Sequence, residues 1–451
     1  MINNYNQLLS PDGEARVSKF FTIVVLVLAI ALPVLLSMTP NTPLIGLIVA
    51  GVIVLLIVIT LFFNILQFSI FVYPLIFFIT DHRLIITLSI LLIVAFMAGR
   101  LLAGKINIDF PNPVVLFILF VAAINGAIRG LNHSNSYYMF KMLILLPMVL
   151  FIIYYNLKPS NKIIEKNLFL ISIYASITGW VSFVNYFLLG QDTRNIIGWY
   201  SQNPAACFFG MIMPFALVSV LQEKNKIRKI FLWGILVGIW TGIFVTQSRA
   251  IYITTLFTLG YIALKDKRAL GVVMPILIAA IVILPSMILY RIMMMFGAGS
   301  ETDWSSVGRV QIWLNSILLI PDYFWFGMGI DSFRTLYSAR FPLIFIRAVH
   351  PHNVYLRWLF EFGIFGMVAY IYILIKPLFT SFKRVRKIDN KVWSTQEKLF
   401  VSLNAGMITA LVASMFDSPF HQPQLSILLW MYVAFLTLLN SRDDSAIVAK
   451  H

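Results

Sequence analysis

The chain has 451 residues, of which 60% are hydrophobic and only 12% are charged, and its formal net charge is +16 at pH 7. This apolar share exceeds that of ordinary soluble domains, so the composition excludes a soluble enzyme. The single cysteine, Cys207, excludes a disulfide framework. In a chain this apolar, the positive charge indicates basic loops beside anionic membrane lipids, and we expect no nucleic-acid partner.

Apolar runs recur along nearly the whole sequence. They predict an all-α polytopic membrane protein, because a helix needs about 20 apolar residues to cross a bilayer. We predict a single transmembrane domain over residues 1–451 with 12–14 transmembrane helices, the first of them an uncleaved span from Phe20. The predicted spans are 20–38, 44–63, 65–80, 84–98, 113–125, 142–157, 168–190, 205–221, 230–247, 251–264, 269–289, 354–378, 399–417 and 425–439.

Three strongly basic connections predict the orientation of the chain. They read QEKNKIRK at 222–229, KDKR at 265–268 and KRVRKIDNK at 383–391. The positive-inside rule places them in the cytoplasm, and counting spans outward from them places both termini there as well. The opposite, outer face then holds the loop 191–204, the tight turn 247–250 and the long loop 290–353.

Arginine dominates the basic residues of this outer face. It presents a planar fork of donors that grips phosphate oxygens in pairs and stays charged. The outer face therefore predicts a phosphate or pyrophosphate ligand, with headgroup anchoring by single arginines as the alternative. The basic residues on this face are Arg83, Arg129, Lys141, Arg194, Arg249, Arg291, Arg309, Arg334, Arg340, Arg347 and Arg357.

Two short outer connections carry candidate phosphate-binding arginines. In QDTRNIIGWYSQNPAACFFG (191–210), Arg194 precedes Asn203-Pro204, where proline suits the first turn of a helix. A helix N-terminus facing outward would add positive potential beside Arg194. In VTQSRAIYI (245–253), the turn is so tight that Arg249 stays near the membrane plane. An ordinary proline start and a simple hairpin with one snorkelling cation are the alternatives.

The long outer loop predicts two helices. Within SSVGRVQIWLNSILLIPDYFWFG (305–327), apolar residues recur at helical spacing on one face. This pattern predicts an amphipathic helix on the membrane surface, with Arg309 in its first turn. A second short helix is predicted over 331–341, after a glycine-containing stretch. The apolar stripe consists of Val310, Trp313, Leu314, Ile317 and Leu318.

The stretch HPHNVYLRWLFEFGIFG (350–366) places titratable groups at the mouth of an apolar span. An imidazole titrates near neutral pH, so His352 can accept a proton from a hydroxyl or donate to an oxyanion. We predict that His352 is the catalytic residue. Its connection lies on the same outer face as Arg194, Arg249 and Arg309. A capping role at the helix start is the alternative.

Four further residues of this stretch are predicted to support His352. His350 and Asn353 flank it in sequence, and Gly363 and Gly366 share its predicted helix face, because His352, Leu356, Leu359 and the two glycines are spaced by four, three, four and three residues. The glycine pair provides either a binding groove or close helix packing.

The same stretch resembles the bacterial O-antigen ligases. That family has a histidine, then Asn, Ser or Gln, nine residues, and then GxxG, and His352, Asn353, Gly363 and Gly366 occupy those places. TRNIIGWYSQNP, TQSRA and GRVQIWLNSILLIPDYFWFGMGIDSF resemble the wider superfamily of O-antigen ligases and polymerases. The resemblance covers roughly residues 190–420.

The resemblance implies a membrane glycosyltransferase whose active site faces the periplasm from the bacterial inner membrane. The donor would be a glycan on undecaprenyl pyrophosphate, and the acceptor a hydroxyl of lipid A–core or of another glycan. The reaction would invert the anomeric carbon and use no metal or other cofactor. The family's essential histidine maps to His352 and its essential arginines to Arg249 and Arg309, with Arg194 a further match.

The residues themselves also favour a metal-free site. Metal-dependent membrane oligosaccharyltransferases place acidic ligands in their first outer loop, and here that loop, MTPNTP (38–43), contains no acid. Asp322 and Asp331 in the long loop are fewer carboxylates than hard cations usually require.

Two alternatives remain at this point. One is an O-antigen or exopolysaccharide polymerase, which would use a second lipid-linked glycan as its acceptor. Polymerases often carry two sizeable arginine-bearing outer loops, whereas the first here is short, which favours a ligase. The other alternative is a transporter of lipid-linked glycan or solute, a class that commonly places charged residues inside its spans. The span centres here are almost free of charge.

Overall fold

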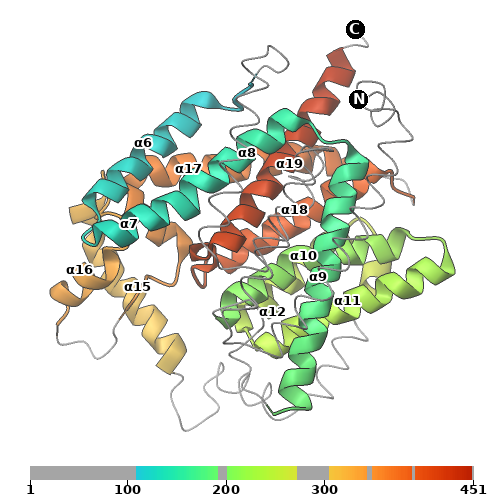
Figure 1. Ribbon diagram of the computed structural model, residues 1–451, viewed down its shortest axis with the longest axis horizontal. Helices are drawn as coiled ribbons and strands as arrows, with labels where there is room; N and C mark the ends of the chain where they lie inside the picture. The colour runs from blue at the N-terminus through green and yellow to red at the C-terminus, as the bar shows by residue number, and fades with distance from the viewer. Residues whose placement is uncertain (1–107, 191–200, 272–303, 343–347, 389–391, 449–451) are drawn as a thin grey trace, which may run out of the picture.

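The computed structural model describes residues 108–190, 201–271, 304–342, 348–388 and 392–448 (Figure 1). Within these ranges the fold is all-helical and contains no strand. The spans predicted at 20–98, residues 272–289 of the span predicted at 269–289, the loop 38–43 and Arg194 lie outside the described residues.

Six helices in the described ranges are long and apolar enough to cross a membrane. This confirms the prediction of an all-α polytopic membrane protein. The total of 12–14 spans stays a prediction, because it depends on residues outside these ranges. The six helices are His133–Leu157, Asn161–Phe187, Gln202–Gln222, Lys226–Thr246, Val354–Arg386 and Pro423–Arg442.

Each span predicted in the described regions overlaps an observed helix, but several bounds differ. Helical structure begins at His133 and Asn161 instead of 142 and 168, one helix ends at Ala413 instead of 417, and two others continue to Arg386 and Val448 instead of 378 and 439. In chain order the elements are α6 (Pro113–Arg129), α7 (His133–Met139), a π-helical segment (Phe140–Leu145), α8 (Leu146–Leu157), α9 (Asn161–Phe187), α10 (Gln202–Gln222), α11 (Lys226–Thr246), α12 (Arg249–Ala263), α15 (Trp304–Tyr323), α16 (Phe333–Arg340), α17 (Val354–Arg386), α18 (Thr395–Ala413), a 3₁₀ turn (Pro419–His421) and α19 (Pro423–Val448).

The helices form two groups that meet along α17, α18 and α19 (Figure 1). In the first group, α17 packs on α6 and α19 packs on α8. In the second, α11 packs on α9, and α10 and α12 pack on α18. The short helix α16 and the longer α15 lie together at one end of the molecule, to the lower left in Figure 1.

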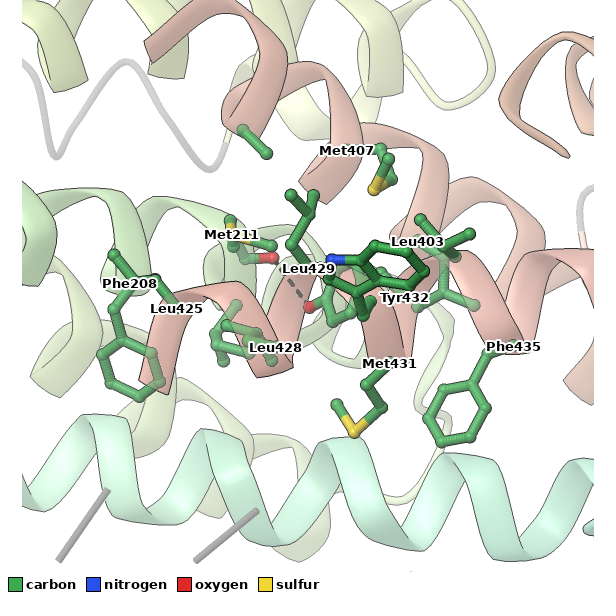
Figure 2. Packing of buried hydrophobic residues seen from close by; sticks show 14 of the residues in the cluster. Phe208, Met211, Leu403, Met407, Leu425, Leu428, Leu429, Met431, Tyr432 and Phe435 are labelled. Carbon is green, nitrogen blue, oxygen red and sulfur yellow. Dashed lines mark hydrogen bonds between the residues drawn. The ribbon is translucent and has the colours of Figure 1, made fainter. Parts of the chain in front are cut away.

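The centre of the bundle is built on α19. Leu425, Leu429 and Phe435 are fully buried, and Figure 2 shows their side chains among those of α10 and α18. Tyr432 is buried too, and its hydroxyl donates to the carbonyl oxygen of Met211 at 3.0 Å. Between membrane helices the lipid is as apolar as the core, so close packing and such hydrogen bonds hold the helices together.

Small residues permit the closest helix contact. A Cβ added to Gly179 of α9 would lie 1.9 Å from the carbonyl oxygen of Gly238 in α11. Only glycine at these positions lets the two backbones approach so closely, and the contact increases van der Waals packing along both helices. This pairing fixes α11, and with it the turn that leads into α12.

The helix α17 is interrupted at Gly363, which corrects the expectation of one continuous face from His352 to Gly366. Gly363 has φ +70° and ψ −177°, and His352 lies before the first helical residue, Val354. Because of the break, the carbonyl of Phe360 and the N–H of Ile364 do not bond to each other as they would in a continuous helix. The carbonyl of Phe360 instead accepts from the N–H of Met328 at 2.6 Å, and the N–H of Ile364 donates to the carbonyl of Phe324 at 2.8 Å.

Protein atoms fill the space beside both glycines of this motif. A Cβ on Gly363 would lie 2.2 Å from the carbonyl oxygen of Trp325, and a Cβ on Gly366 would lie 2.9 Å from Cβ of Ala122 in α6. Of the two roles that the sequence allowed for the pair, the geometry is that of close packing. The glycines connect α17 to the end of α15 and to α6.

The long loop forms two helices with an internal apolar core. Ile312 and Leu319 of α15 pack with Phe333 and Tyr337 of α16, and the amide of Asn315 donates to the hydroxyl of Tyr337 at 2.8 Å. The other face of α15 is apolar and exposed, as the sequence pattern predicted. Its exposed residues are Val310, Leu314, Ile317 and Leu318.

We predict that Gly363→Ala destabilises the protein by about 1–3 kcal/mol, because alanine rarely adopts φ +70° and its Cβ would clash with the backbone of Trp325. The midpoint of thermal unfolding in detergent micelles would measure this. Gly260→Ala is the control, since a Cβ there meets nothing within 4 Å. Equal midpoints for the two variants would contradict the prediction.

Candidate active site

Polar side chains gather where α10, α12 and α17 begin and α18 ends. The carboxylate of Asp417, in the connection after α18, lies at their centre. Its Oδ1 is 3.2 Å from Nδ1 of His352, and its Oδ2 is 4.0 Å from Nη2 of Arg309. The side-chain amide of Asn203, near the start of α10, also donates to Oδ2. Four separate segments therefore meet at one carboxylate.

The backbone around His352 is held firmly against the end of α18. The side-chain oxygen of Asn353 accepts from the N–H of Leu356 at 3.1 Å and so caps α17, as helix starts commonly require. The amide of Asn353 donates to the carbonyl of Met415 at 3.1 Å, and the N–H of Val354 donates to the carbonyl of Ser414 at 2.9 Å. His352 itself has φ +49°, a left-handed conformation that these contacts maintain.

Asp417 is ionised in this setting. Burial alone would raise its pKa, but the hydrogen bond and charge of His352, together with the charges of His350 and Arg309, hold the pKa of this carboxyl well below its usual range. The backbone N–H of Ser418 also donates to Oδ1 at 2.7 Å. The carboxylate therefore acts only as a hydrogen-bond acceptor.

The charge of Asp417 determines which nitrogen of His352 carries the proton. Because an ionised carboxylate can only accept, the hydrogen bond requires a proton on Nδ1 of His352. In the neutral imidazole the lone pair is then on Nε2, the other ring nitrogen. The side chain of His352 is 29% exposed, so this nitrogen belongs to a ring that a substrate can reach. The arrangement is that of a base oriented by a carboxylate.

Arg249 lies beside the same cluster. It begins α12 directly after Ser248, whose hydroxyl donates to the side-chain oxygen of Asn203 at 3.0 Å. Asn203 in turn contacts Asp417. Ser248 therefore does not cap α12 with its side chain, and the first amides of that helix keep their positive potential next to the arginine.

Two more histidines extend the cluster away from Asp417. The ring centroids of His350 and His352 are 4.2 Å apart, and those of His350 and His421 are 6.4 Å apart. Burial and the positive charges of His352 and Arg357 lower the pKa of His350 to about 4, although Asp417 opposes them. The charge of Arg357, followed by burial and His350, lowers the pKa of His421. Both imidazoles are neutral at physiological pH.

The ligand atoms of His350, His352 and Asp417 lie within 4.8 Å of one another, a spacing that a metal ion could bridge. However, the donor atoms are already engaged. Nδ1 of His350 accepts from the N–H of His352 at 3.4 Å, and the oxygens of Asp417 accept from His352, Asn203 and Ser418. A guanidinium 4.0 Å from the carboxylate further disfavours a cation. The set fits a hydrogen-bonded base better than a metal centre.

Of the residues predicted for the site, the structure brings together Arg309, His350 and His352 and places Arg249 next to them. Asn353 lies at the cluster as a helix cap. Gly363 and Gly366 instead pack further along α17, and Arg194 is outside the described residues.

The sequence alone did not indicate the carboxylate of Asp417, the amide of Asn203 or the imidazole of His421 as parts of the site. Asp417 was predicted as the last residue of the span 399–417, whereas the observed helix α18 ends at Ala413 and leaves Asp417 in the connection to α19. The polar residues of SMFDSPFHQP (414–423), which include His421, were the available signal. Asn203 was considered only for its place before Pro204.

The fold and the site together define an integral membrane protein with a carboxylate-oriented histidine among arginines, an arrangement suited to an anionic substrate. Residues 234–371 match the family model described as O-antigen ligase. The matched segment contains His352, and the match is consistent with an O-antigen ligase family member and confirms the resemblance seen around this residue. The match supports, in general terms, a glycosyltransferase-like activity on lipid-linked glycans. No curated protein matches the chain.

The low pKa of His350 predicts acid sensitivity. The unfolded chain binds a proton at this imidazole below about pH 6.5, whereas the folded chain does so only below about 4. Stability therefore falls as the pH drops through this window, and His421 acts in the same direction. Thermal midpoints between pH 7 and pH 4 should fall less steeply for His350→Gln than for the wild type. His133→Gln, at an exposed site on α7, should follow the wild type. Parallel curves for His350→Gln and the wild type would contradict this assignment.

Proposed function

We propose that the protein is an O-antigen ligase. It transfers a glycan from undecaprenyl pyrophosphate to a hydroxyl of lipid A–core or a related acceptor, on the periplasmic face of the bacterial inner membrane, with both termini in the cytoplasm. The observation that carries this proposal is the hydrogen bond between His352 and Asp417 beside Arg309. Glycan transfer from a lipid diphosphate requires a base for the acceptor hydroxyl and a cation for the leaving pyrophosphate, and this site at the end of the helix bundle provides both.

In this mechanism Nε2 of His352 accepts the proton of the acceptor hydroxyl. The acceptor oxygen then forms a bond to the anomeric carbon of the donor sugar, and the bond from that carbon to the pyrophosphate oxygen breaks. The electron pair of the broken bond leaves with undecaprenyl pyrophosphate, and attack from the opposite side inverts the anomeric carbon. Asp417 stabilises the imidazolium that forms, while remaining ionised itself.

The leaving group is already activated, so the protein has mainly to neutralise its growing negative charge. Arg309 is suited to this task because its side chain is 30% exposed and close to His352's partner, Asp417. Arg249 and the uncapped start of α12 provide a second positive surface next to Asn203. Arg194, which precedes α10 in the sequence, is the proposed third contact. No metal or other cofactor is needed for these steps.

The exposed apolar face of α15 supports a position at the membrane surface. Val310 and Leu314 are 50% and 56% exposed and lie on the helix that carries Arg309. Such a face is stable against lipid and unfavourable in water. With α15 seated in the interface, Arg309 lies at the depth of lipid headgroups, where the pyrophosphate of a membrane-bound donor is found.

Substitutions of His352 and Asp417 should distinguish the base from the residue that orients it. We expect His352→Ala to lower kcat by about 10²–10⁴-fold, because the base is lost. Asp417→Asn should lower kcat less while leaving the KM for the donor nearly unchanged, because the residue orients the base and does not bind the donor. Purified protein with lipid-linked glycan and acceptor would provide both constants. Wild-type turnover by His352→Ala would remove this residue from the mechanism.

Deletion of the gene should distinguish a ligase from a polymerase. A ligase mutant leaves bare lipid A–core and accumulates lipid-linked polymer, whereas a polymerase mutant leaves core carrying one repeat unit. A plasmid copy with Arg309→Ala should fail to restore the lipopolysaccharide. Arg334→Ala, at an exposed site on the neighbouring α16, should restore it. Transport of the glycan without bond formation by the purified protein would favour a transporter instead.

A further inference from the structure

A second pocket lies at the end of α10 opposite to the candidate active site. Its volume is about 410 Å³, and it is an open pocket lined by residues of α9, α10, α11 and α18 and by Glu223, which follows α10. The helix α10 has 21 residues, which corresponds to roughly 30 Å, about the hydrocarbon thickness of a bilayer. Asn203 contacts Asp417 at one end of α10, and Glu223 lines the pocket at the other. The pocket therefore belongs to the opposite membrane face.

The lining of this pocket combines a cationic rim with an aromatic wall. Lys166, Arg228 and Lys398 provide three positive charges from three different helices. Phe169 and Phe231 form part of the wall, with ring centroids 6.4 Å apart. A ligand that fits this lining has an anionic head and an apolar tail.

Three helix N-termini add to the positive potential of the rim. The helices α9, α11 and α18 all begin at this end of the bundle, after the caps Ser160, Asn225 and Ser394. The N-terminus of a helix carries a partial positive charge that favours anions. This contribution comes on top of the side-chain charges of the same three helices.

Two carboxylates also line the pocket, and they leave its net charge positive. Glu165 and Glu223 stand against the three cations Lys166, Arg228 and Lys398. The carboxylate of Glu223 accepts from the backbone N–H groups of Lys224 and Asn225, both at 2.8 Å. Its charge is therefore partly satisfied within the loop that follows α10.

The surface beside the pocket is suited to lipid. Ile227, Ile230 and Phe231 on the first turns of α11 are 80%, 72% and 56% exposed. Exposed apolar side chains on a membrane-spanning helix are suited to contact with acyl chains. A ligand entering the pocket from this side comes from the bilayer.

We propose that this pocket binds an anionic phospholipid, with the phosphate against Arg228 and Lys398 and an acyl chain along Phe169 and Phe231. Basic pockets between membrane helices are suited to such headgroups, and lipid in this site holds α9, α11 and α18 together. The inference concerns the opposite membrane face and is independent of the reaction proposed for His352.

The test uses the purified full-length protein in detergent micelles, with dioleoyl phosphatidylglycerol or dioleoyl phosphatidylcholine added. Ligands that bind only the folded state raise its apparent stability. We expect phosphatidylglycerol to raise the thermal midpoint by a few degrees and phosphatidylcholine to raise it less. Arg228→Gln/Lys398→Gln should lose this difference. The matched control, Arg386→Gln/Lys387→Gln, removes two exposed charges outside the pocket and should keep it.

Native mass spectrometry of the wild type provides a second measurement that depends on no variant, and it should retain phosphatidylglycerol in preference to phosphatidylcholine. Equal midpoint shifts for the two lipids, or equal losses in both double variants, would overturn the proposal. A shift of the same size with inorganic phosphate alone would identify a soluble anion as the ligand, which also contradicts it. Equal retention of dioleoyl phosphatidylethanolamine would contradict the requirement for net negative charge.

Discussion

The carboxylate of Asp417 is the interaction on which the site depends. Removing such a charge from water is expensive, and it is tolerated only when hydrogen bonds and opposite charges surround it. Here His352, Asn203 and Arg309 provide them from three other segments of the chain. Without the carboxylate, the amide of Asn203 and the ring of His352 would lose their common acceptor, and the guanidinium of Arg309 would lose its nearest counter-charge. Asp417 therefore both assembles the site and selects the proton position on His352.

The directions of the helices give the two ends of the bundle different chemistry. At the active-site end α10, α12 and α17 begin, and their positive ends lie close to Arg249 and His352. At the other end α9, α11 and α18 begin, next to the basic rim of the second pocket. Because up-and-down connectivity alternates helix starts between the two faces, each face acquires a cluster of N-termini. Both ends are thus suited to anions, and the side chains decide which anion each binds.

The sequence predicted the parts of this structure that depend on local pattern. Apolar runs located the described spans, helical spacing located the exposed stripe on α15, and titratable residues at a span mouth pointed to His352. The role of Asp417 was not predicted because the residue is 65 positions from His352 in sequence, and a polar stretch after an apolar span does not show which residues its acid contacts. The break at Gly363 was not predicted from the sequence for a related reason. Its φ of +70° is stabilised by backbone contacts with Phe324 and Met328, which only the folded chain provides.

The break at Gly363 also explains how His352 and Arg309, which come from different segments, lie close together. The carbonyl of Phe360 and the N–H of Ile364 would bond to each other in an unbroken helix. Instead they bond to the segment that follows α15, and so attach the C-terminal end of α15 to α17. Nearer its other end, the indole N–H of Trp313 donates to the carbonyl of Pro351 at 2.9 Å, one residue before His352. These two attachments hold the helix that carries Arg309 against the segment that carries His352. The first glycine of the motif thus acts through backbone geometry, and the chemistry is left to the side chains that it holds in place.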